Sequence, residues 1–295
     1  MPSNHDLHLL FHQTALSSTT NDQENVSAFQ GDLAAPDSLY PACKDVDCIV
    51  HFAGALFAPC PEKFLPITNV QYVKNLLAIA VESKVKKFIL ISFPHVEGES
   101  TPDRPALGCL ESKPNSIHAR TRLEAEKHLF DYTSGTGVTP VVLRTGMIYG
   151  RGVLMIEAAR WLLPRRLLGV WREPTWIHLL SLPDFLDCTT TAIEEEHISG
   201  IYNLGDEKPL FLQEFLDAFA QHSGYTKPWR APRWLFPLVG GFTELGAWLL
   251  KKPAPLTRDF IRIGMVSYTA NTDRMRKELL PELNYPNLAT GLELL

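Results

Sequence analysis

The amino-acid sequence predicts an α/β fold, in which a doubly wound parallel sheet is followed by a smaller, mostly helical C-terminal lobe. In the first half of the chain, short apolar runs alternate with segments of helical periodicity. This alternation is typical of parallel strands joined by crossover helices that cover both faces of the sheet. In the second half, prolines punctuate a stretch with few strand signals. We therefore expect a sheet domain over residues 1–150 and a lobe over 151–295, interleaved with the last strands of the sheet.

Each predicted element rests on its own pattern. Apolar runs of a few residues predict buried strands, and apolar side chains that recur every three or four residues predict helices. In the helix expected over 69–82, for example, Val70, Val73 and Leu77 fall on one face. The predicted strands cover residues 46–52, 87–92, 138–144, 176–180 and 200–204. The predicted helices cover residues 69–82, 121–132, 156–168, 184–195 and 212–222.

Charge and cysteine content exclude several classes of partner and site. The chain has 295 residues, 45% of them hydrophobic, and can bury a full core. Its net charge of −5 gives no reason to expect a nucleic-acid partner, because such binding needs a basic patch. Five cysteines, scattered without a Cys-x-x-Cys pair, predict free thiols in a reducing compartment and no metal site. The sequence shows no apolar N-terminal leader, and we expect a cytoplasmic protein.

The apolar stretch at residues 234–250 bears on membrane contact. It is shorter than the ~20 residues that a membrane-spanning helix needs, and it contains Pro237 and Glu244. We expect a buried or partner-facing helix here, and contact with a membrane surface is the alternative.

Seven short motifs follow one another along the chain. They lie at 4–10, 26–33, 51–55, Asn69, 143–150, 176–184 and 200–205. In this order they resemble the landmarks of the extended short-chain dehydrogenase/reductase superfamily, of the NAD-dependent epimerase/dehydratase type. The resemblance implies a Rossmann-like fold, two further strands over 4–10 and 26–33, and NAD or NADP as the cofactor.

The same resemblance assigns residues to the cofactor. It implies that Asp32 and Leu33 lie beside the adenine ring and that Thr145 is close to the nicotinamide. The turn that includes Gly54 would pass under the cofactor, because small residues let a dinucleotide lie against the backbone. The residues assigned to cofactor binding are Asp32, Leu33, Phe52, Ala53, Gly54, Ala55, Asn69, Arg122, Thr145, Gly146 and Ile148.

The residues that carry chemistry in this superfamily are replaced. There a Tyr acts as acid and base, a Lys lowers its pKa and holds the nicotinamide ribose, and a Ser or Thr orients the substrate. In this chain His118 and Arg122 stand in the Tyr and Lys positions, and Phe93 stands in the Ser position. Imidazole can act as a general acid or base near neutral pH, whereas an arginine can hold a hydroxyl or phosphate but cannot shuttle a proton. The candidate catalytic residues are His118, Arg122, Ser92 and His95. The charged residues that continue this helix and are expected on its solvated face are Glu124, Glu126 and Lys127.

The glycine-rich phosphate loop is also missing. The family opens with a strand, a Gly-x-x-Gly-x-x-Gly turn and a helix whose N-terminus holds the pyrophosphate. In this chain the first glycine is Gly31. We expect that one strand and helix, roughly 25–30 residues, are lost to a truncated or misassigned start, because a sheet without its central strand exposes two edges. The alternative is that the chain folds as it stands and has lost tight dinucleotide binding.

Two functions are therefore open. The first is an NAD(P)-dependent oxidoreductase or epimerase/dehydratase with a non-standard active site, whose small-molecule substrate is held by the C-terminal lobe. The aromatic residues of that lobe, Trp229, Trp234, Phe236 and Trp248, favour an apolar substrate. The second is a catalytically inactive dinucleotide-binding, sensor or assembly module, which the replaced residues favour. The resemblance also implies a homodimer.

Overall fold

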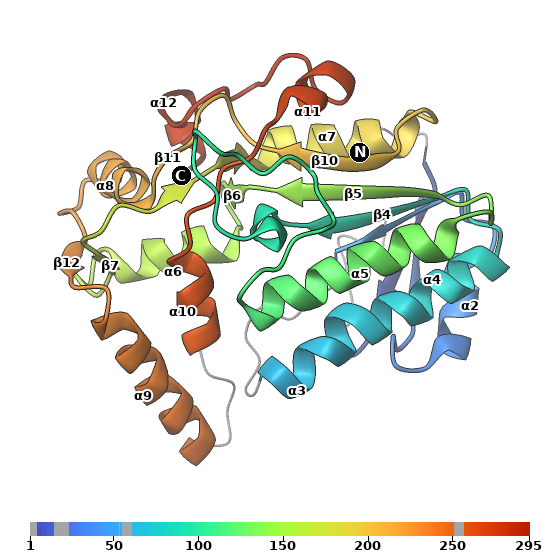
Figure 1. Ribbon diagram of the computed structural model, residues 1–295, viewed down its shortest axis with the longest axis horizontal. Coiled ribbons are helices and arrows are strands. Elements are labelled where there is room, and N and C mark those ends of the chain that lie inside the picture. The colour runs from blue at the N-terminus through green and yellow to red at the C-terminus, as the bar shows by residue number, and fades with distance from the viewer. Residues whose placement is uncertain (1–4, 15–23, 53, 55–60, 251–256) are drawn as a thin grey trace.

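Four parallel strands form the central sheet of the protein (Figure 1). They are β3 (Cys48–His51), β4 (Lys87–Ser92), β5 (Thr139–Thr145) and β10 (Gly200–Leu204). The strand order is β10-β5-β4-β3, and each neighbouring pair runs parallel. The structure is a computed structural model that describes residues 5–14, 24–52, 54, 61–250 and 257–295. The parallel sheet confirms the predicted α/β class.

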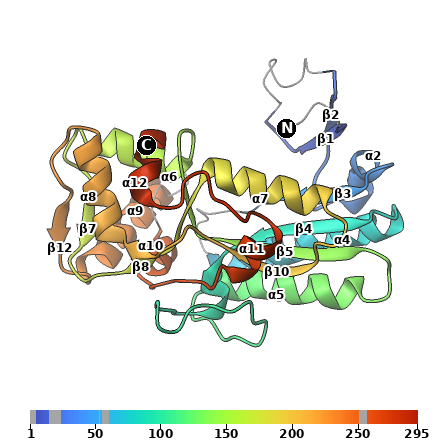
Figure 2. The same cartoon turned by 90° about the horizontal axis from the view of Figure 1, so that it is seen from above.

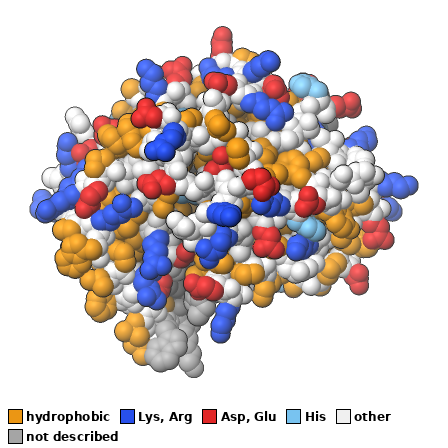
Figure 3. Space-filling model, in the orientation of Figure 1, with side chains coloured by type: hydrophobic (Ala, Val, Ile, Leu, Met, Phe, Trp, Pro, Cys, Tyr) orange, Lys and Arg blue, Asp and Glu red, His pale blue; other side chains and the backbone are white. Residues whose placement is uncertain are grey.

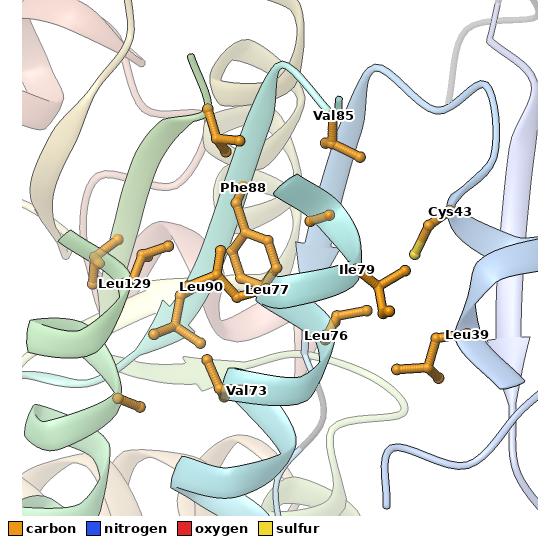
Figure 4. Close-up of a cluster of buried hydrophobic side chains, with 14 residues drawn as sticks. Leu39, Cys43, Val73, Leu76, Leu77, Ile79, Val85, Phe88, Leu90 and Leu129 are labelled. Carbon is orange, nitrogen blue, oxygen red and sulfur yellow. The ribbon is translucent and has the colours of Figure 1, made fainter. Parts of the chain in front are cut away.

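Helices cover both faces of this sheet. Helices α4 (Tyr72–Glu82) and α5 (Ile117–Thr133) lie on one face, and α7 (Leu182–Glu194) lies on the other. Because side chains alternate along a strand, β4 contributes to both cores. Phe88 and Leu90 pack with α4 and α5 (Figure 4), whereas Ile89 packs with Phe185 of α7. The sheet is therefore doubly wound, as predicted.

Two further parallel strands form a separate sheet. They are β1 (Leu7–Phe11) and β2 (Val26–Gln30), and they pair only with each other among the described residues. Figure 2 shows this pair set to one side of the central sheet. Most residues of β2 are exposed, whereas all but one of those in β4 are buried. Among the described residues, neither β1 nor β2 pairs with a strand of the central sheet.

The rest of the chain forms short strands and helices. The short strands pair as β6 with β9, β7 with β12 and β8 with β11. They are β6 (Met147–Tyr149), β7 (Gly169–Trp171), β8 (Trp176–Ile177), β9 (Leu179–Ser181), β11 (Leu210–Phe211) and β12 (Trp229–Ala231). The helices of the C-terminal half are α6 (Leu154–Leu162), α8 (Leu212–His222), α9 (Leu235–Leu250), α10 (Arg258–Gly264), α11 (Asp273–Glu278) and α12 (Leu288–Gly291). The remaining short helices are η1 (Pro36–Leu39), α2 (Tyr40–Cys43), α3 (Pro61–Leu65), η2 (Pro66–Gln71), η3 (Pro94–Glu97) and η4 (Leu292–Leu294).

Local chemistry explains where predicted and observed boundaries differ. The helix expected from residue 69 continues from a π-helical segment, η2, that begins at Pro66. The helix expected over 156–168 ends at Leu162, because Pro164 lacks the backbone N–H that would continue the helical hydrogen bonds. Helix α7 begins at Leu182 because the Oγ of Ser181 caps it. The strand at 200–204 and the helix at 212–222 have the predicted bounds.

Candidate functional site

The carboxyl ends of neighbouring strands carry the predicted site residues. His51 ends β3, Ser92 ends β4 and Thr145 ends β5. These strands are adjacent, and Ser92 is paired with Arg144 in the ladder. Open parallel sheets bind their ligands at this edge. The topology therefore places the residues expected from the motifs on the side where a ligand is expected.

Helix α5 brings polar side chains to this edge. It begins after Ser116, whose Oγ accepts a hydrogen bond of 3.0 Å from the backbone N–H of Ala119. His118, Arg122 and Glu126 are spaced four residues apart and so lie on one side of the helix. All three are buried. A helix face of this kind needs partners or a ligand, because buried polar groups without partners are costly.

Glu126 belongs to a buried ion-pair network, so its predicted place on the solvated face was wrong. Its carboxylate accepts hydrogen bonds from the Nε and Nη2 of Arg144, at 3.1 and 2.6 Å, and from the Oγ of Ser92. The Nη1 of Arg144 donates to Glu97 of η3. A buried arginine needs a carboxylate partner. The presence of Arg144 in an apolar strand is therefore the sequence signal that could have identified a buried carboxylate such as Glu126. Of the two other charged residues expected on the solvated face, Glu124 is exposed and Lys127 is half-buried.

Arg122 lies in a different environment. Its Nε and Nη1 have no hydrogen-bond partner among the described residues, although the side chain is buried. Its Nη2 lies against Gly54, where an added Cβ would be only 2.6 Å away. Burial lowers the pKa of Arg122 to about 10, and the charge of Glu126 acts in the opposite direction. The guanidinium is therefore charged at neutral pH and has N–H donors left over.

Asn69 and His51 add further polar atoms beside Arg122. Asn69 is fully buried in η2, and its Nδ2 donates to the Oγ1 of Thr121 at 3.0 Å. The Oδ1 of Asn69 and the Nε2 of His51 have no hydrogen-bond partner among the described residues. Burial, and then the charge of Arg122, lower the pKa of His51 to about 3. Buried polar atoms normally have partners, so this cluster is suited to a ligand with both donors and acceptors.

The two candidate histidines meet around an aromatic ring. The ring of Phe93 lies edge-on to both, with centroids 5.1 Å from His118 and 5.4 Å from His95. Burial, and then the charge of Arg122, lower the pKa of His118 to about 4. Burial, and then the charge of His118, also lower the pKa of His95 to about 4. Both imidazoles are therefore neutral near pH 7.

The hydroxyl of Ser92 is engaged in a hydrogen bond on the side away from this pair of histidines. Its Oγ donates to Glu126, which lies two helical turns beyond His118 on α5. The structure thus brings His118, His95 and Arg122 together, and it engages the Ser92 hydroxyl in the ion-pair network.

The C-terminal lobe reaches the site through Tyr268. Its ring centroid lies 4.3 Å from that of His95, and its backbone N–H donates to the carbonyl of Trp176 at 3.0 Å. Burial raises the pKa of the Tyr268 hydroxyl. Reasoning from the sequence missed this contact, because no local pattern relates residue 268 to residue 95.

The turn expected under the cofactor is described in part. Phe52 is 57% exposed, and its ring lies edge-on to that of Phe185 at 6.2 Å. Gly54 is exposed and lies against Arg122. Ala53 and Ala55 lie outside the described residues.

The residues expected at the adenine lie just after β2. The Oδ1 of Asp32 accepts a hydrogen bond from the backbone N–H of Ala34 at 2.8 Å, and its own N–H donates to the Oγ of Ser38 at 2.9 Å. Leu33 packs against the core between α4 and the sheet, and its carbonyl accepts from Asn75 at 2.7 Å. Both residues are thus held in an ordered turn.

The segment expected beside the nicotinamide crosses from β5 to β6. An added Cβ at Gly146 would lie 2.3 Å from the carbonyl oxygen of His178, so only glycine allows this close approach. The Oγ1 of Thr145 donates to the carbonyl of Gly146 at 3.1 Å. Ile148 is half-buried and packs in the core on the α7 side of the sheet. Gly146 therefore has a structural role in addition to its predicted one.

In the described part of the chain, no group of three or more His, Cys, Asp or Glu side chains is arranged to hold a metal ion. The cysteines described, all with free thiols, are Cys43, Cys48, Cys109 and Cys188.

A doubly wound parallel sheet places the protein in the α/β class, whose members bind ligands at the carboxyl edge of the sheet, where the polar cluster described above lies. The sequence profile of the NAD dependent epimerase/dehydratase family matches residues 2–205. The chain therefore belongs to this family, which confirms the resemblance seen in its motifs.

Individual relatives are more distant. The UDP-glucose 4-epimerase of Vibrio cholerae is 26% identical over 151 residues, which are 48% of this chain and 45% of the relative. The chain thus spans about half the length of this relative. MoeE5, solved in complex with UDP-glucuronic acid and NAD, has a TM-score of 0.73 at 16% identity, covering 98% of this chain and 89% of its own. The UDP-glucose 4-epimerase of Thermotoga maritima, solved with UDP-glucose, has a TM-score of 0.73 at 16% identity, covering 97% and 88%. Likeness at such identities shows the fold alone.

Proposed function

We propose that this chain binds a nicotinamide dinucleotide, NAD or NADP, at the carboxyl edge of the central sheet. Asn69 and Arg122 would hold the nicotinamide ribose over Gly54, and Asp32 and Leu33 would lie at the adenine. The bound protein would be an oxidoreductase or epimerase/dehydratase with a non-standard active site.

One observation carries this proposal: Arg122 is a buried cation with N–H groups that have no partner in the part of the chain that the structure describes. Leaving a buried charged donor without an acceptor costs on the order of 1–3 kcal/mol or more. Apolar residues of similar size would be at least as stable in a purely structural role. Hydroxyl or phosphate oxygens of a ligand would satisfy the free Nε and Nη1 groups, and the absence of a Cβ at Gly54 keeps this position open.

The fit is better at one end of the cofactor than at the other. The nicotinamide end has Asn69, Arg122 and the turn at Gly54. At the pyrophosphate, the sequence offers no glycine-rich turn, and among the described residues β1 and β3 have no strand between them. Binding by this chain is therefore expected to be weaker than with a complete phosphate loop. The dinucleotide would supply hydride transfer when bound.

The neutral state of His118 limits what it can do. An imidazole with a pKa of about 4 is almost never protonated at pH 7, so His118 would donate its N–H to a substrate oxygen as a neutral group. The charge of Arg122 helps to keep it neutral. His95, which shares the Phe93 ring, is a candidate for a second contact to the substrate.

The substrate we propose is a small molecule, reaching His118 from the side of the C-terminal lobe. The structure gives less support for an apolar substrate than the sequence did. Trp229 stacks on Phe236 at 5.8 Å and is half-exposed, and Trp234 is 64% exposed. These rings belong to the outer surface of the lobe, and the Trp248 side chain lies outside the described ones.

A non-catalytic module is the second candidate function. It is favoured by the bonding of Ser92, whose hydroxyl donates to Glu126, and by the replacement of the proton-transferring Tyr and Lys. Such a protein would bind the dinucleotide at the same edge and would act as a sensor or an assembly subunit.

Titration with NADH and with NADPH, followed by calorimetry, tests the binding site. We expect Arg122→Met to weaken binding roughly tenfold to a hundredfold, the effect of losing a charged hydrogen bond. Arg120→Met is the matched control, because Arg120 lies two residues away on α5 and is exposed. Equal affinities in all three proteins, or no binding by the unmodified chain, would remove the support for the proposal.

Conversion of UDP-glucose in the presence of NAD, compared with His118→Ala, separates the two candidate functions. Turnover that is lost in His118→Ala at unchanged dinucleotide affinity favours the enzyme. Dinucleotide binding without turnover of this or related sugar nucleotides favours the non-catalytic module.

A further inference from the structure

Helix α9 and Trp234, the residue just before it, carry a stripe of large apolar side chains on the outer side of the helix. Trp234, Leu238, Phe242, Leu245 and Leu249 are between 52% and 73% exposed. At 3.6 residues per turn, their spacing places them within roughly 80° of the helix circumference. The opposite side of α9 packs against α10. An exposed apolar patch of this size marks a surface that is covered by a partner.

The apolar surface continues beyond α9. Trp229 of β12 is half-exposed and stacks on Phe236 of α9 at 5.8 Å. A shallow pocket joins residues 226–229 to residues 163–168 after α6. Trp161, at the end of α6, is 56% exposed and lies under the guanidinium of Arg165 at 4.2 Å. We call this region, α9 with residues 161–168 and 226–234, the α9 surface.

Basic residues accompany the α9 surface. The segments 151–172 and 226–262 hold 12 of the 28 Lys and Arg residues of the chain but only 3 of its 33 Asp and Glu residues. The rest of the chain is strongly acidic. In Figure 3, orange hydrophobic side chains follow the lower left margin, where Figure 1 shows α9, and blue basic side chains lie beside them. The exposed basic residues at or beside this surface include Arg165, Arg166, Lys227, Arg233 and Arg262.

We propose that the α9 surface docks on an anionic phospholipid bilayer, with the axis of α9 in the plane of the interface. Helices with one apolar face and flanking basic residues bind membranes in this way. Tryptophan is enriched at the membrane interface, and three exposed tryptophans occur on this surface. Basic residues near the bilayer are attracted to anionic headgroups. In the described ranges no helix is long and apolar enough to cross a membrane.

The charge of the α9 surface disfavours a second copy of the chain as its partner. A symmetric dimer places the same patch of each copy against itself. Here it would place one basic surface against another, and like charges across an interface are repulsive. An anionic lipid surface is complementary to both the apolar stripe and the cations.

Vesicle flotation of the full chain tests the proposal. We expect binding to vesicles of phosphatidylcholine with phosphatidylglycerol, and little binding to phosphatidylcholine alone. Phe242→Ser should lower the partition coefficient about tenfold or more, because a buried Phe side chain is lost from the interface. Leu186→Ser on α7 removes an apolar side chain that is 49% exposed and lies elsewhere on the protein, and it should have no effect.

Charge-reversal variants test how much the basic residues contribute to vesicle binding. The double change Arg165→Glu with Arg166→Glu should weaken binding to the anionic vesicles, and so should high salt. Lys44→Glu, at an exposed site near α2, should not. Circular dichroism of each variant checks that the fold is retained.

Three results would overturn the proposal. One is the absence of flotation with anionic vesicles. Another is equal binding to neutral vesicles that salt does not change. The third is a dimer, seen by light scattering, that Phe242→Ser dissociates while vesicles bind neither protein. None of these outcomes bears on dinucleotide binding, so the two proposals can fail separately.

Discussion

Two buried arginines on the same side of the central sheet have opposite environments. Arg144 of β5 is fully buried, and each of its three guanidinium nitrogens donates to an acceptor on Glu126, Glu97 or Cys109. Arg122 of α5 is equally enclosed, yet its Nε and Nη1 have no partner among the described residues. Burial lowers the pKa of Arg122, whereas carboxylates surround Arg144.

The difference separates a residue whose bonds hold the fold from one that, under the proposed function, would bind a ligand. The bonds of Arg144 tie β5 to α5 and to η3, so they fix the base on which α5 presents its side chains. The Nε and Nη1 of Arg122 form no such bonds with the described residues, and burying these donors without acceptors is a cost to the folded chain. Functional sites are where such costs are tolerated, because the ligand removes them.

Replacing each arginine with methionine tests this contrast and has the largest expected effect. Arg144→Met leaves Glu126 and Glu97 as buried carboxylates without their cation, and the free energy of unfolding should fall by about 3–5 kcal/mol. Arg122→Met should change it by less than about 1 kcal/mol, or raise it, because the Nε and Nη1 of Arg122 bond to none of the described residues. Urea denaturation followed by circular dichroism measures both. A large loss of stability in Arg122→Met would show that this arginine too is structural.

Acid should destabilise the protein through the buried histidines, and His118 is the one to isolate. Its pKa is about 4 in the folded chain against 6.5 for an ordinary histidine. Between these values the unfolded chain binds the extra proton, so stability is complete above about pH 6.5 and is lost as the pH falls toward 4. At 1.36 kcal/mol per pKa unit, His118 accounts for about 3 kcal/mol of this loss.

His118→Gln keeps a polar, uncharged group and should remove that share of the acid sensitivity. The free energy of unfolding is measured at pH 7 and near pH 4.5. His197→Gln, at an exposed position, serves as the control and should leave the slope unchanged. His51 and His95 still titrate in the variant, so a reduced slope rather than a flat one is expected. An unchanged slope would mean that His118 is accessible to protons in the folded state.

Much of the fold could be predicted because apolar periodicity reports which face of an element is buried. The strand at 200–204 and the helix at 212–222 were predicted at their observed bounds. Boundaries set by single residues were less visible: Pro164 ends α6 early, and Pro66 begins the π-helical segment before Asn69. Periodicity carries no information on such local breaks.

The site was predicted in part for a related reason. The four-residue spacing placed His118 and Arg122 on one face of a helix, which the structure has. The same spacing applies to Glu126, but charged residues are usually exposed, and only the distant Arg144 reveals why this one is buried. Tyr268 covers His95 through a contact between segments far apart in the chain, which no local pattern encodes.

The smallest expected effect concerns Gly54. The variant Gly54→Ala tests whether the position of the Arg122 guanidinium matters for binding. An alanine Cβ would be 2.6 Å from the Nη2 of Arg122. The contact is with the far end of a flexible side chain, so the guanidinium can move aside, and the free energy of unfolding should change by less than about 1 kcal/mol.

A displaced guanidinium should nevertheless weaken NADH binding, by a factor of several, because hydrogen bonds to a ligand depend on position. Gly246→Ala is the matched control, since an added Cβ there meets nothing within 4 Å. If Gly54→Ala binds NADH as tightly as the unmodified chain while Arg122→Met does not, the charge of Arg122 is needed but its place over Gly54 is not. If both variants bind normally, the free donors of Arg122 serve some other ligand, and the contrast with Arg144 would still hold.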